Sequence, residues 1–416
     1  MNKHQIKRVS KISLLNSNTR KLIWSWALFD FANSSYSAVI GAVIFPVYYS
    51  TYIVGEKSLG DLLWGRAISL SMFLAALMSP FLGSSRDITG YKKKTIFALV
   101  FLGSLSVSGF AFLKPLDIYL GFWLVVLANF SLETSLVIYN AYLPEVIPVS
   151  YWGRVSAWGF GLGYLGSIFS LIIALYFLNQ KQFSFIWLTV SLFWILFSLP
   201  LLFSFPADIK GKFEVNLLKK AYKKTFFTLK EVFKNKNLRF FFLSYFFYLD
   251  GVNTVIIFSS LFAYKTLGFN FKELVYLYLL VQFTSLLGCF ILAKPFDKFN
   301  LKKIISFLIL FWFCISLLTF FTYAKTLFWV VATLAGLGLG SIQAGSRAFF
   351  SALIPSGQEG SYFGFYGLVG KSSAILGPLG FGLVSYIFKS QRPAVLWVGL
   401  LFLLGYLFFK QIDSRI

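Results

Sequence analysis

The amino-acid sequence predicts an all-α polytopic membrane protein, with twelve transmembrane helices in two six-helix halves. Three observations predict this fold: the apolar composition, the recurrence of long apolar runs, and the uneven distribution of positive charge. Of the 416 residues, 58% are hydrophobic and 20% aromatic, whereas only 13% are charged. A soluble domain of this length cannot bury so much apolar surface, so we expect lipid to be its solvent.

The apolar runs divide the chain into twelve expected spans. These spans cover residues 22–53, 62–84, 94–113, 116–143, 154–178, 184–205, 238–266, 272–293, 303–323, 326–354, 361–388 and 393–411. They are much longer than the ten-residue alternating segments of a membrane β-barrel. The first run lacks a small-residue cleavage site and is about twice as long as the apolar region of a signal peptide, so we expect it to remain as a helix. The expected regions are a basic cytoplasmic tail (1–21), the first half (22–205), a basic linker (206–237), the second half (238–411) and a short cytoplasmic tail (412–416).

The net charge of +23 indicates membrane topology rather than nucleic-acid binding. With a cytoplasmic N-terminus, 28 of the 38 Lys and Arg residues fall in or beside the cytoplasmic segments, and 9 in or beside the outer segments. This asymmetry follows the positive-inside rule and places both termini in the cytoplasm. The basic loops then face the anionic headgroups of the inner leaflet.

Residue types that support catalysis or metal binding are scarce in the expected spans. The only histidine, His4, lies in the N-terminal tail, and the two cysteines, Cys289 and Cys314, lie in different spans. A membrane enzyme would need a nucleophile with a base, or a metal centre. We therefore expect no catalytic residue, no metal and no cofactor. Since the sequence gives no sign of oligomerisation, we expect a monomer.

Two patterns repeat between the halves, about 210 to 220 residues apart. The pattern D-x-x-N-[ST] occurs in the first span of each half, formed by Asp30, Asn33 and Ser34 and then by Asp250, Asn253 and Thr254. The second pattern follows the second span of each half, as GSSRDITGYKKK and then as AKPFDKFNLKK. Its candidate gate residues are Gly83, Asp87, Gly90, Lys92 and Lys93 in the first copy and Asp297 in the second.

The loop pattern G-x-x-x-D-x-x-G-x-K-K resembles the motif between the second and third helices of the major facilitator superfamily. Six-plus-six spans with cytoplasmic termini is the architecture of those transporters. The glycines permit a tight turn, and Asp87 can pair with a cation or a helix N-terminus to lock the two halves on the inner side. The alternative is a plain turn whose lysines only follow the positive-inside rule.

Ionisable side chains within the spans gather near the middle of the bilayer. Asp30, Glu133, Asp250 and Lys371 lie about 9 to 12 residues from the inner ends of their spans, which is ~13–18 Å at 1.5 Å per residue. Arg347 is shallower, at about 8 residues. Because an ionisable group in lipid costs a few kcal/mol, each should face a polar cavity and have a partner.

Helical periodicity extends these polar faces with amide side chains. Asn129, Glu133 and Asn140 share one stripe of the fourth span, and Gln343 shares a face with Arg347. The predicted substrate or proton site consists of eight residues: Asp30, Asn33, Glu133, Asp250, Asn253, Gln343, Arg347 and Lys371. Glycine-rich stripes at 159–166, 336–341 and 364–371 predict close helix packing and bending.

This arrangement predicts a secondary transporter of a small solute that works by alternating access with proton coupling. Burial favours the protonated form of a carboxylate, which can then bind and release a proton as access alternates. Lys371 and Arg347 can bind the carboxylate of an amphoteric solute, while a site carboxylate binds its amine. The alternatives are a proton-independent facilitator, an exporter of another metabolite or drug, and a non-transporting sensor. The polar residues can also bond helices together, and Lys371 can form a permanent pair with a carboxylate.

Five further stretches lie in three regions of the chain. They are WALFDFANSSYSAVIGAVIFPVYY, then YNAYLPEVIP with GRVSAWGFGLGYLGS, and finally SIQAGSRAFFSALIP with YFGFYGLVGKSSAILGP. Together they resemble the family called Unknown Major Facilitator-1, which includes the autophagy-related vacuolar amino-acid effluxers of fungi, over residues 24 to about 383. The resemblance implies a transporter with amino-acid efflux, and it implies functional roles for Asp30, Asn33, Gln343, Ser346, Arg347 and Lys371. The compact loops are similar to those of prokaryotic members, so we expect a bacterial cytoplasmic (inner) membrane protein.

Overall fold

The structure, a computed structural model, describes residues 17–83, 92–146, 152–204, 215–298, 300–353 and 359–413. All regular elements in these ranges are helices, which confirms the all-α prediction. The first half contains α1 (Ser17–Ser35), η2 (Tyr36–Val43), α2 (Phe45–Tyr48), η3 (Tyr49–Ile53), α3 (Lys57–Gly83), α4 (Lys92–Gly109), η4 (Phe110–Phe112), α5 (Ile118–Val146), α6 (Trp152–Asn179) and α7 (Phe183–Ser204). After the connecting helix α8 (Val215–Lys234), the second half contains α9 (Lys236–Leu267), α10 (Phe271–Lys298), α11 (Leu301–Phe321), α12 (Lys325–Leu353), α13 (Glu359–Ser372), α14 (Leu376–Phe388) and α15 (Gln391–Lys410).

Each expected span coincides with one helix or with one interrupted helix. In the described part of the chain, ten helices are long and apolar enough to cross a membrane, or up to eleven when the bent pair Arg20–Val43 and Phe45–Ile53 is one span. The helix α10, which is the expected eighth span, is not among these ten. The total of twelve spans and the cytoplasmic placement of the termini stay predictions.

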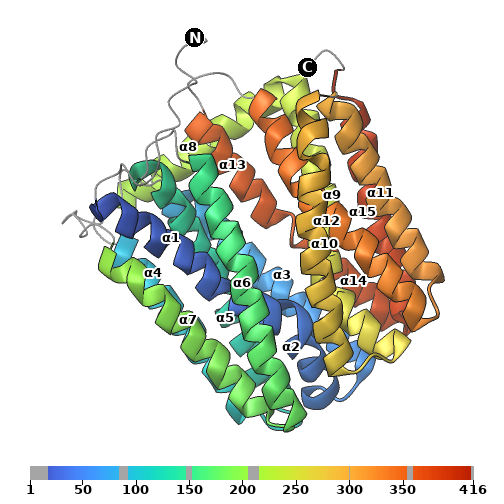
Figure 1. Ribbon diagram of the computed structural model, residues 1–416. Coiled ribbons are helices and arrows are strands. Elements are labelled where there is room, and N and C mark those ends of the chain that lie inside the picture. Colours follow the sequence, from blue (N-terminus) through green and yellow to red (C-terminus); the bar gives the residue numbers. More distant parts are fainter. Residues whose placement is uncertain are drawn as a thin grey trace.

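The two halves lie side by side and repeat the same packing. Figure 1 shows the first half in blue to green beside the second half in yellow to red. In the first half α1 packs on α7, α3 on α5, and α4 on α5 and α7; in the second half α9 packs on α15, α10 on α12, and α11 on α12 and α15. These pairs correspond under an offset of six spans, so the repeat in the sequence is also a repeat of the fold.

The connecting helix α8 defines the two ends of the molecule. It runs along one end and contacts α3 of the first half and α9 and α13 of the second. We call this the inner end. The opposite, outer end carries the turns at 54–56, 268–270 and 389–390.

Several helix ends follow directly from the local sequence. The side chain of Asn235 accepts hydrogen bonds from the second and third N–H groups of the chain that follows it, at 3.0 and 3.2 Å, and so caps α9. The same helix ends at Gly268, whose φ of 75° suits glycine. Asn300, which replaces the second glycine in the second copy of the loop pattern, caps α11 by accepting from the Lys303 N–H at 3.3 Å.

Two of the expected spans are interrupted. The first bends by about 40° near Ile44, and its outer part winds as the π-helices η2 and η3. The eleventh breaks at Ser373–Ile375, between α13 and α14. Pro378 lies in the first turn of α14, where its missing N–H has no helical partner to lose.

Glycines bring α6 into backbone contact with α1. A Cβ atom at Gly166 would collide with the backbone carbonyl of Phe31, and one at Gly163 would lie 2.9 Å from Ser34 Oγ. Such approach is possible only with small residues at the interface. The stripe 159–166 is therefore a packing surface within the first half.

Most of the expected cytoplasmic gate lies outside the described residues. This applies to Asp87 and Gly90 and to the environments of Gly83, Lys92 and Asp297. Lys93 is partly exposed in the first turn of α4. The gate stays a prediction.

Candidate functional site

An ion pair deep within the helices joins the two halves. Lys371 Nζ on α13 donates to Glu133 Oε2 on α5. The two side chains are 15% and 21% exposed, so the pair is largely withdrawn from solvent but still accessible. Lys371 lies in the last turn of α13, where the helix dipole favours a cation. Two of the five intramembrane charges therefore meet directly.

Asp250 lies against the break in the eleventh span. Its side chain is fully buried, and its Oδ1 accepts a hydrogen bond of 2.9 Å from the Gly377 N–H at the start of α14. The first N–H groups of a helix have no partner within it, and the dipole there favours an anion. Among the described residues, Oδ2 has no hydrogen-bond partner. The broken helix thus has a cation at the end of α13 and a carboxylate at the start of α14.

Asp30 is held between three helices of the first half. Its Oδ2 accepts a hydrogen bond of 2.8 Å from the hydroxyl of Tyr139 on α5. The Tyr139 ring stacks on Trp26 at 4.3 Å between centroids. Gly159 on α6 leaves the room for this arrangement, because a Cβ atom there would collide with the carboxylate of Asp30 and the ring of Trp26. The carboxylate is therefore positioned by α1, α5 and α6 together.

A buried hydroxyl lies near the interhalf ion pair. Tyr36, the first residue of η2, is 1% exposed, and its hydroxyl has no hydrogen-bond partner in the described part of the chain. The side chain is close enough to Glu133 to interact with it electrostatically. Buried polar atoms are normally paired, and π-helical segments are frequent at functional sites. The Tyr36 hydroxyl is thus a candidate contact for a polar ligand.

The remaining expected site residues have separate environments. Asn33 is buried and its Oδ1 accepts a hydrogen bond of 2.7 Å from Trp194 Nε1, inside the first half. Asn253 is partly buried on α9, whereas Gln343 and Arg347 are exposed on α12. The eight residues therefore form one interhalf ion pair, two carboxylate sites in different halves, one packing amide, one partly buried amide and one exposed polar face.

A second buried ion pair links the halves at the outer end. Asp61 Oδ1 on α3 lies 2.7 Å from Lys265 Nζ on α9, and the two side chains are 1% and 3% exposed. Asp61 Oδ2 accepts from Ser385 Oγ at 2.7 Å and from Gln391 Nε2 at 2.9 Å. Lys265 Nζ also donates to the hydroxyl of Ser50. We call these five residues the outer network.

Neither the outer network nor the break was predicted from the sequence. Asp61 and Lys265 lie at the ends of expected spans, where charges ordinarily mark the boundary of the bilayer. The dipeptide Gly377–Pro378 within a span was the available signal for the break. Tyr139 begins the stretch YNAYLPEVIP, but nothing in that stretch marks it as the partner of Asp30, and the chain contains 22 tyrosines.

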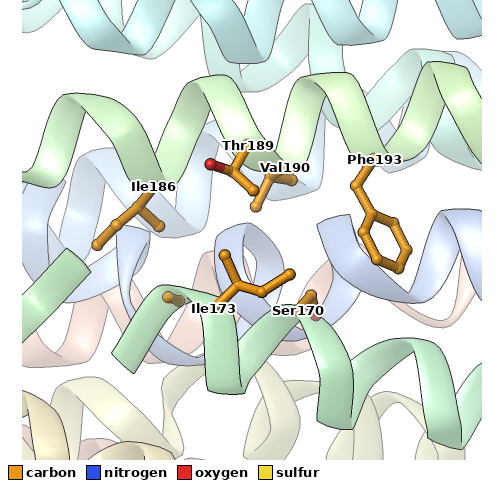
Figure 2. A pocket seen from close by; sticks show the side chains of 7 residues that line it. Ser170, Ile173, Ile186, Thr189, Val190 and Phe193 are labelled. Carbon is orange, nitrogen blue, oxygen red and sulfur yellow. The ribbon is translucent and has the colours of Figure 1, made fainter. Parts of the chain in front are cut away.

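A small crevice between α6 and α7 is not part of the candidate site. Figure 2 shows its lining residues, which are Ser170, Ile173, Ala174, Ile186, Thr189, Val190 and Phe193. It has room for about one water molecule, and its two hydroxyls donate to carbonyls of their own helices, at 3.0 and 2.6 Å. Across the described ranges, no group of three His, Cys, Asp or Glu side chains could hold a metal ion.

Comparisons with known sequences identify relatives of the chain. The family described as "Vacuole effluxer Atg22 like" matches residues 66–415. The uncharacterized MFS-type transporter YxiO of Bacillus subtilis (strain 168) is 30% identical over 402 residues, which cover 92% of each chain. Autophagy-related protein 22 of Coccidioides immitis (strain RS) is 23% identical over 91% of this chain and 77% of its own.

Solved structures of transporters share the fold. The nucleoside transporter NupG has a TM-score of 0.71 at 15% identity, covering 96% of this chain and all of its own. A D-xylose-proton symporter has a TM-score of 0.66 at 15% identity, covering 95% and 98% of the two chains. A bacterial homologue of the human lysosomal transporter Spinster, inward-facing and unoccupied, has a TM-score of 0.66 at 13% identity, covering 95% and 97%.

Two helical halves with the same packing, joined across a polar centre, are typical of a membrane transporter of the major facilitator type, and the relative YxiO is described as a transporter of this type. More narrowly, the chain belongs to the Atg22-like vacuole effluxer family. The bacterial relative supports a bacterial origin.

Proposed function

We propose that this transporter is a proton-coupled exporter of a small amphoteric solute of the amino-acid class, and that it works by alternating access. The Glu133–Lys371 pair carries the proposal. It joins one helix of each half, at a broken helix, and both side chains remain partly exposed. Binding sites of secondary transporters typically lie between the repeats, at discontinuous helices. The family description of vacuole effluxers supports the direction of transport.

The two charges of this pair match those of an amino acid. The solute carboxylate replaces Glu133 at the ammonium of Lys371, and the solute amine replaces Lys371 at the carboxylate of Glu133. A solute with both charges leaves neither residue unpaired, whereas a simple anion or cation leaves one buried charge uncompensated at a cost of several kcal/mol. Because Glu133 and Lys371 belong to different halves, a solute between them changes the contact that holds the halves together.

The contacts between the halves support a state closed at the outer end. There α3 packs along α14, and α2 packs against α9. The outer network adds the Asp61–Lys265 ion pair to this contact. Arg347 is exposed on the inner part of α12. Because a cation facing lipid is costly, we assign this exposed face to the inner entrance of the transport path.

Asp30 is the proposed proton carrier. Its carboxylate is partly buried and has a hydroxyl rather than a cation as its hydrogen-bond partner. The hydroxyl of Tyr139 can donate to the ionised carboxylate and accept from the protonated acid. The 2.8 Å contact can therefore persist in both protonation states, which allows the proton to enter and leave without repacking the three helices around it.

Ligand-dependent stability tests the solute class. The melting temperature of the purified protein is measured with amino acids, dipeptides, sugars, nucleosides and common drugs. A solute that binds only the folded state at a hundred times its Kd adds ~2.7 kcal/mol of stability. We expect a shift with one class of amino acid that is lost in Lys371→Ala.

Lys325→Ala is the matched control, because Lys325 pairs with Glu273 at 2.8 Å within the second half. This variant should keep the shift. If the melting temperature shifts with another class of solute but not with amino acids, the amino-acid assignment is wrong. Flux in proteoliposomes that is independent of the pH gradient would identify a facilitator instead.

A further inference from the structure

The connecting helix α8 is fixed at the inner end by one of its faces. Val232 and Thr228 on this face are 0% and 6% exposed. The hydroxyl of Tyr222 donates to the backbone carbonyl of Leu77 on α3 at 2.6 Å. Figure 1 shows α8 lying along this end of both halves, and it contacts α9 and α13 as well as α3. The orientation of its other faces is therefore defined.

The face next to the packed face is aromatic and exposed. Tyr222, Phe226 and Phe233 follow the spacing i, i+4, i+11 and so share one stripe of the helix. Their exposed fractions are 38%, 55% and 47%. We call these three residues the aromatic stripe. An apolar stripe of this kind is unfavourable in water, because each exposed ring forgoes the gain of apolar burial.

A row of lysines borders the aromatic stripe. Lys223, Lys230 and Lys234 follow the spacing i, i+7, i+11, so they share a second stripe of the helix beside the aromatic one. All three are exposed. Lys230 Nζ lies 4.8 Å from the centroid of the Phe226 ring, so the two surfaces adjoin. Aromatic side chains beside a lysine-rich face are typical of a helix that lies in the plane of a membrane interface.

We propose that α8 is an in-plane anchor at the inner end. Its aromatic stripe inserts at the boundary between headgroups and acyl chains, and its lysine row binds anionic phospholipid headgroups. Charge complementarity selects this occupant, because a lysine near an anionic bilayer raises affinity about fivefold, whereas a second copy would bring like charges together. The start of α1 at the same end carries exposed Arg20 and Lys21 beside Trp24, which is 51% exposed. Basic and aromatic residues together mark a membrane interface.

Adjacent phenylalanines on α8 provide a matched test. Phe226 and Phe227 are both exposed, at 55% and 62%, but Phe227 lies beyond the lysine row. Each is replaced by a single nitroxide-labelled cysteine, F226C or F227C, in the full chain with Cys289→Ser and Cys314→Ser, in nanodiscs that contain phosphatidylglycerol. We expect the label at 226 to collide more with oxygen than with a water-soluble nickel chelate, and the label at 227 to show the reverse.

Two outcomes of this measurement would contradict the proposal that α8 is an in-plane anchor. Equal preferences at 226 and 227 would place both faces in the same medium. Exclusion of both reagents at 226 alone would mean that protein, such as a second copy, covers the aromatic stripe. A label in place of Phe233 repeats the test further along the helix and must agree with the label at 226.

The lysine row is tested separately with spin-labelled lipids. The double variant K223Q/K230Q should lower the preference of the reconstituted protein for phosphatidylglycerol over phosphatidylcholine, by up to about 25-fold at this site. The control is K114Q/K181Q, which removes two exposed lysines from the outer end and should leave that contact unchanged. Equal effects of the two double variants, or no effect of K223Q/K230Q, would overturn the assignment of anionic headgroups.

Discussion

Replacement of Asp30 by asparagine separates proton transfer from binding. In Asp30→Asn the side-chain carbonyl can still accept the hydrogen bond that Tyr139 donates at 2.8 Å, but the side chain can no longer carry a proton. We expect uptake driven by a pH gradient to be lost in proteoliposomes, while solute exchange without a gradient and the melting temperature are kept. Asp413→Asn, which makes the same change at an exposed carboxylate that pairs with Lys236, serves as the control that stays coupled. Gradient-driven uptake at the wild-type rate in Asp30→Asn would refute this role.

Tyr36→Phe tests whether the hydroxyl of Tyr36 contacts the solute or only fills space. It is buried and unpaired within the described residues, so its removal in Tyr36→Phe should not lower the melting temperature. If the hydroxyl bonds the solute next to Glu133, the variant loses a hydrogen bond to a charged group, and the Kd should rise by about tenfold or more. Unchanged affinity, measured by the same thermal titration, would show that Tyr36 only fills space.

The sequence could predict that charges within spans matter, but not which groups they contact. Depth along a helix supplies one coordinate, and the choice of partner depends on rotation and on neighbouring helices. Asp30 and Asp250 occupy equivalent positions of the repeat, yet one accepts from the Tyr139 hydroxyl and the other from the Gly377 N–H. Asn33, on the same polar face as Asp30, bonds Trp194 instead.

The glycine stripe between α1 and α6 gives a prediction at the scale of whole helices. In Gly166→Ala the new methyl group collides with the Phe31 carbonyl, so the helices must separate, at a cost of ~1–3 kcal/mol. Gly161→Ala on the same helix is the control, because nothing lies within 4 Å of its added Cβ. We expect a lower melting temperature for the first variant and an unchanged or slightly higher one for the second. Equal losses in the two variants would mean that the loss does not come from close packing against α1.

The helices were predictable for a physical reason that does not extend to their interruptions. A backbone in lipid must satisfy its own hydrogen bonds, so long apolar runs have to be helical, and each expected span coincides with a helix or an interrupted helix. The break before Leu376 depends instead on whether another helix can accept the freed N–H groups. Asp250, more than a hundred residues away in the chain, accepts a hydrogen bond from the Gly377 N–H. No local pattern in the eleventh span predicts that Asp250 is this partner.

Among the described residues, two of the ion pairs between the halves are withdrawn from solvent, and they differ in depth and in exposure. The Glu133–Lys371 pair is 21% and 15% exposed, and the Asp61–Lys265 pair at the outer end is 1% and 3% exposed. A solute can therefore compete for the first pair while the second remains closed. In the proposed cycle the outer pair must separate before the solute can leave on that side, so its strength sets the population of the outward-open state.

Asp61→Asn should therefore shift the molecule toward outward opening. The substitution leaves Lys265 buried without its carboxylate in the closed state, and loss of one partner of a buried pair costs ~3–5 kcal/mol, which is a population shift of at least about a hundredfold. The distance between nitroxides at exposed Lys181 and Tyr323, one in each half at the outer end, measures the opening. We expect a longer-distance population to appear in Asp61→Asn.

Glu56→Gln is the control for this measurement, because Glu56 also pairs across the halves, with Lys389 at 3.4 Å, but both side chains are more than half exposed. Such a surface pair contributes ~0–1 kcal/mol, so the distance distribution should stay that of the wild type. An unchanged distribution in Asp61→Asn as well would assign closure to backbone packing between α3 and α14, where a Cβ atom at Gly65 would collide with the Pro378 carbonyl. In that case Gly65→Ala, rather than Asp61→Asn, would open the outer end.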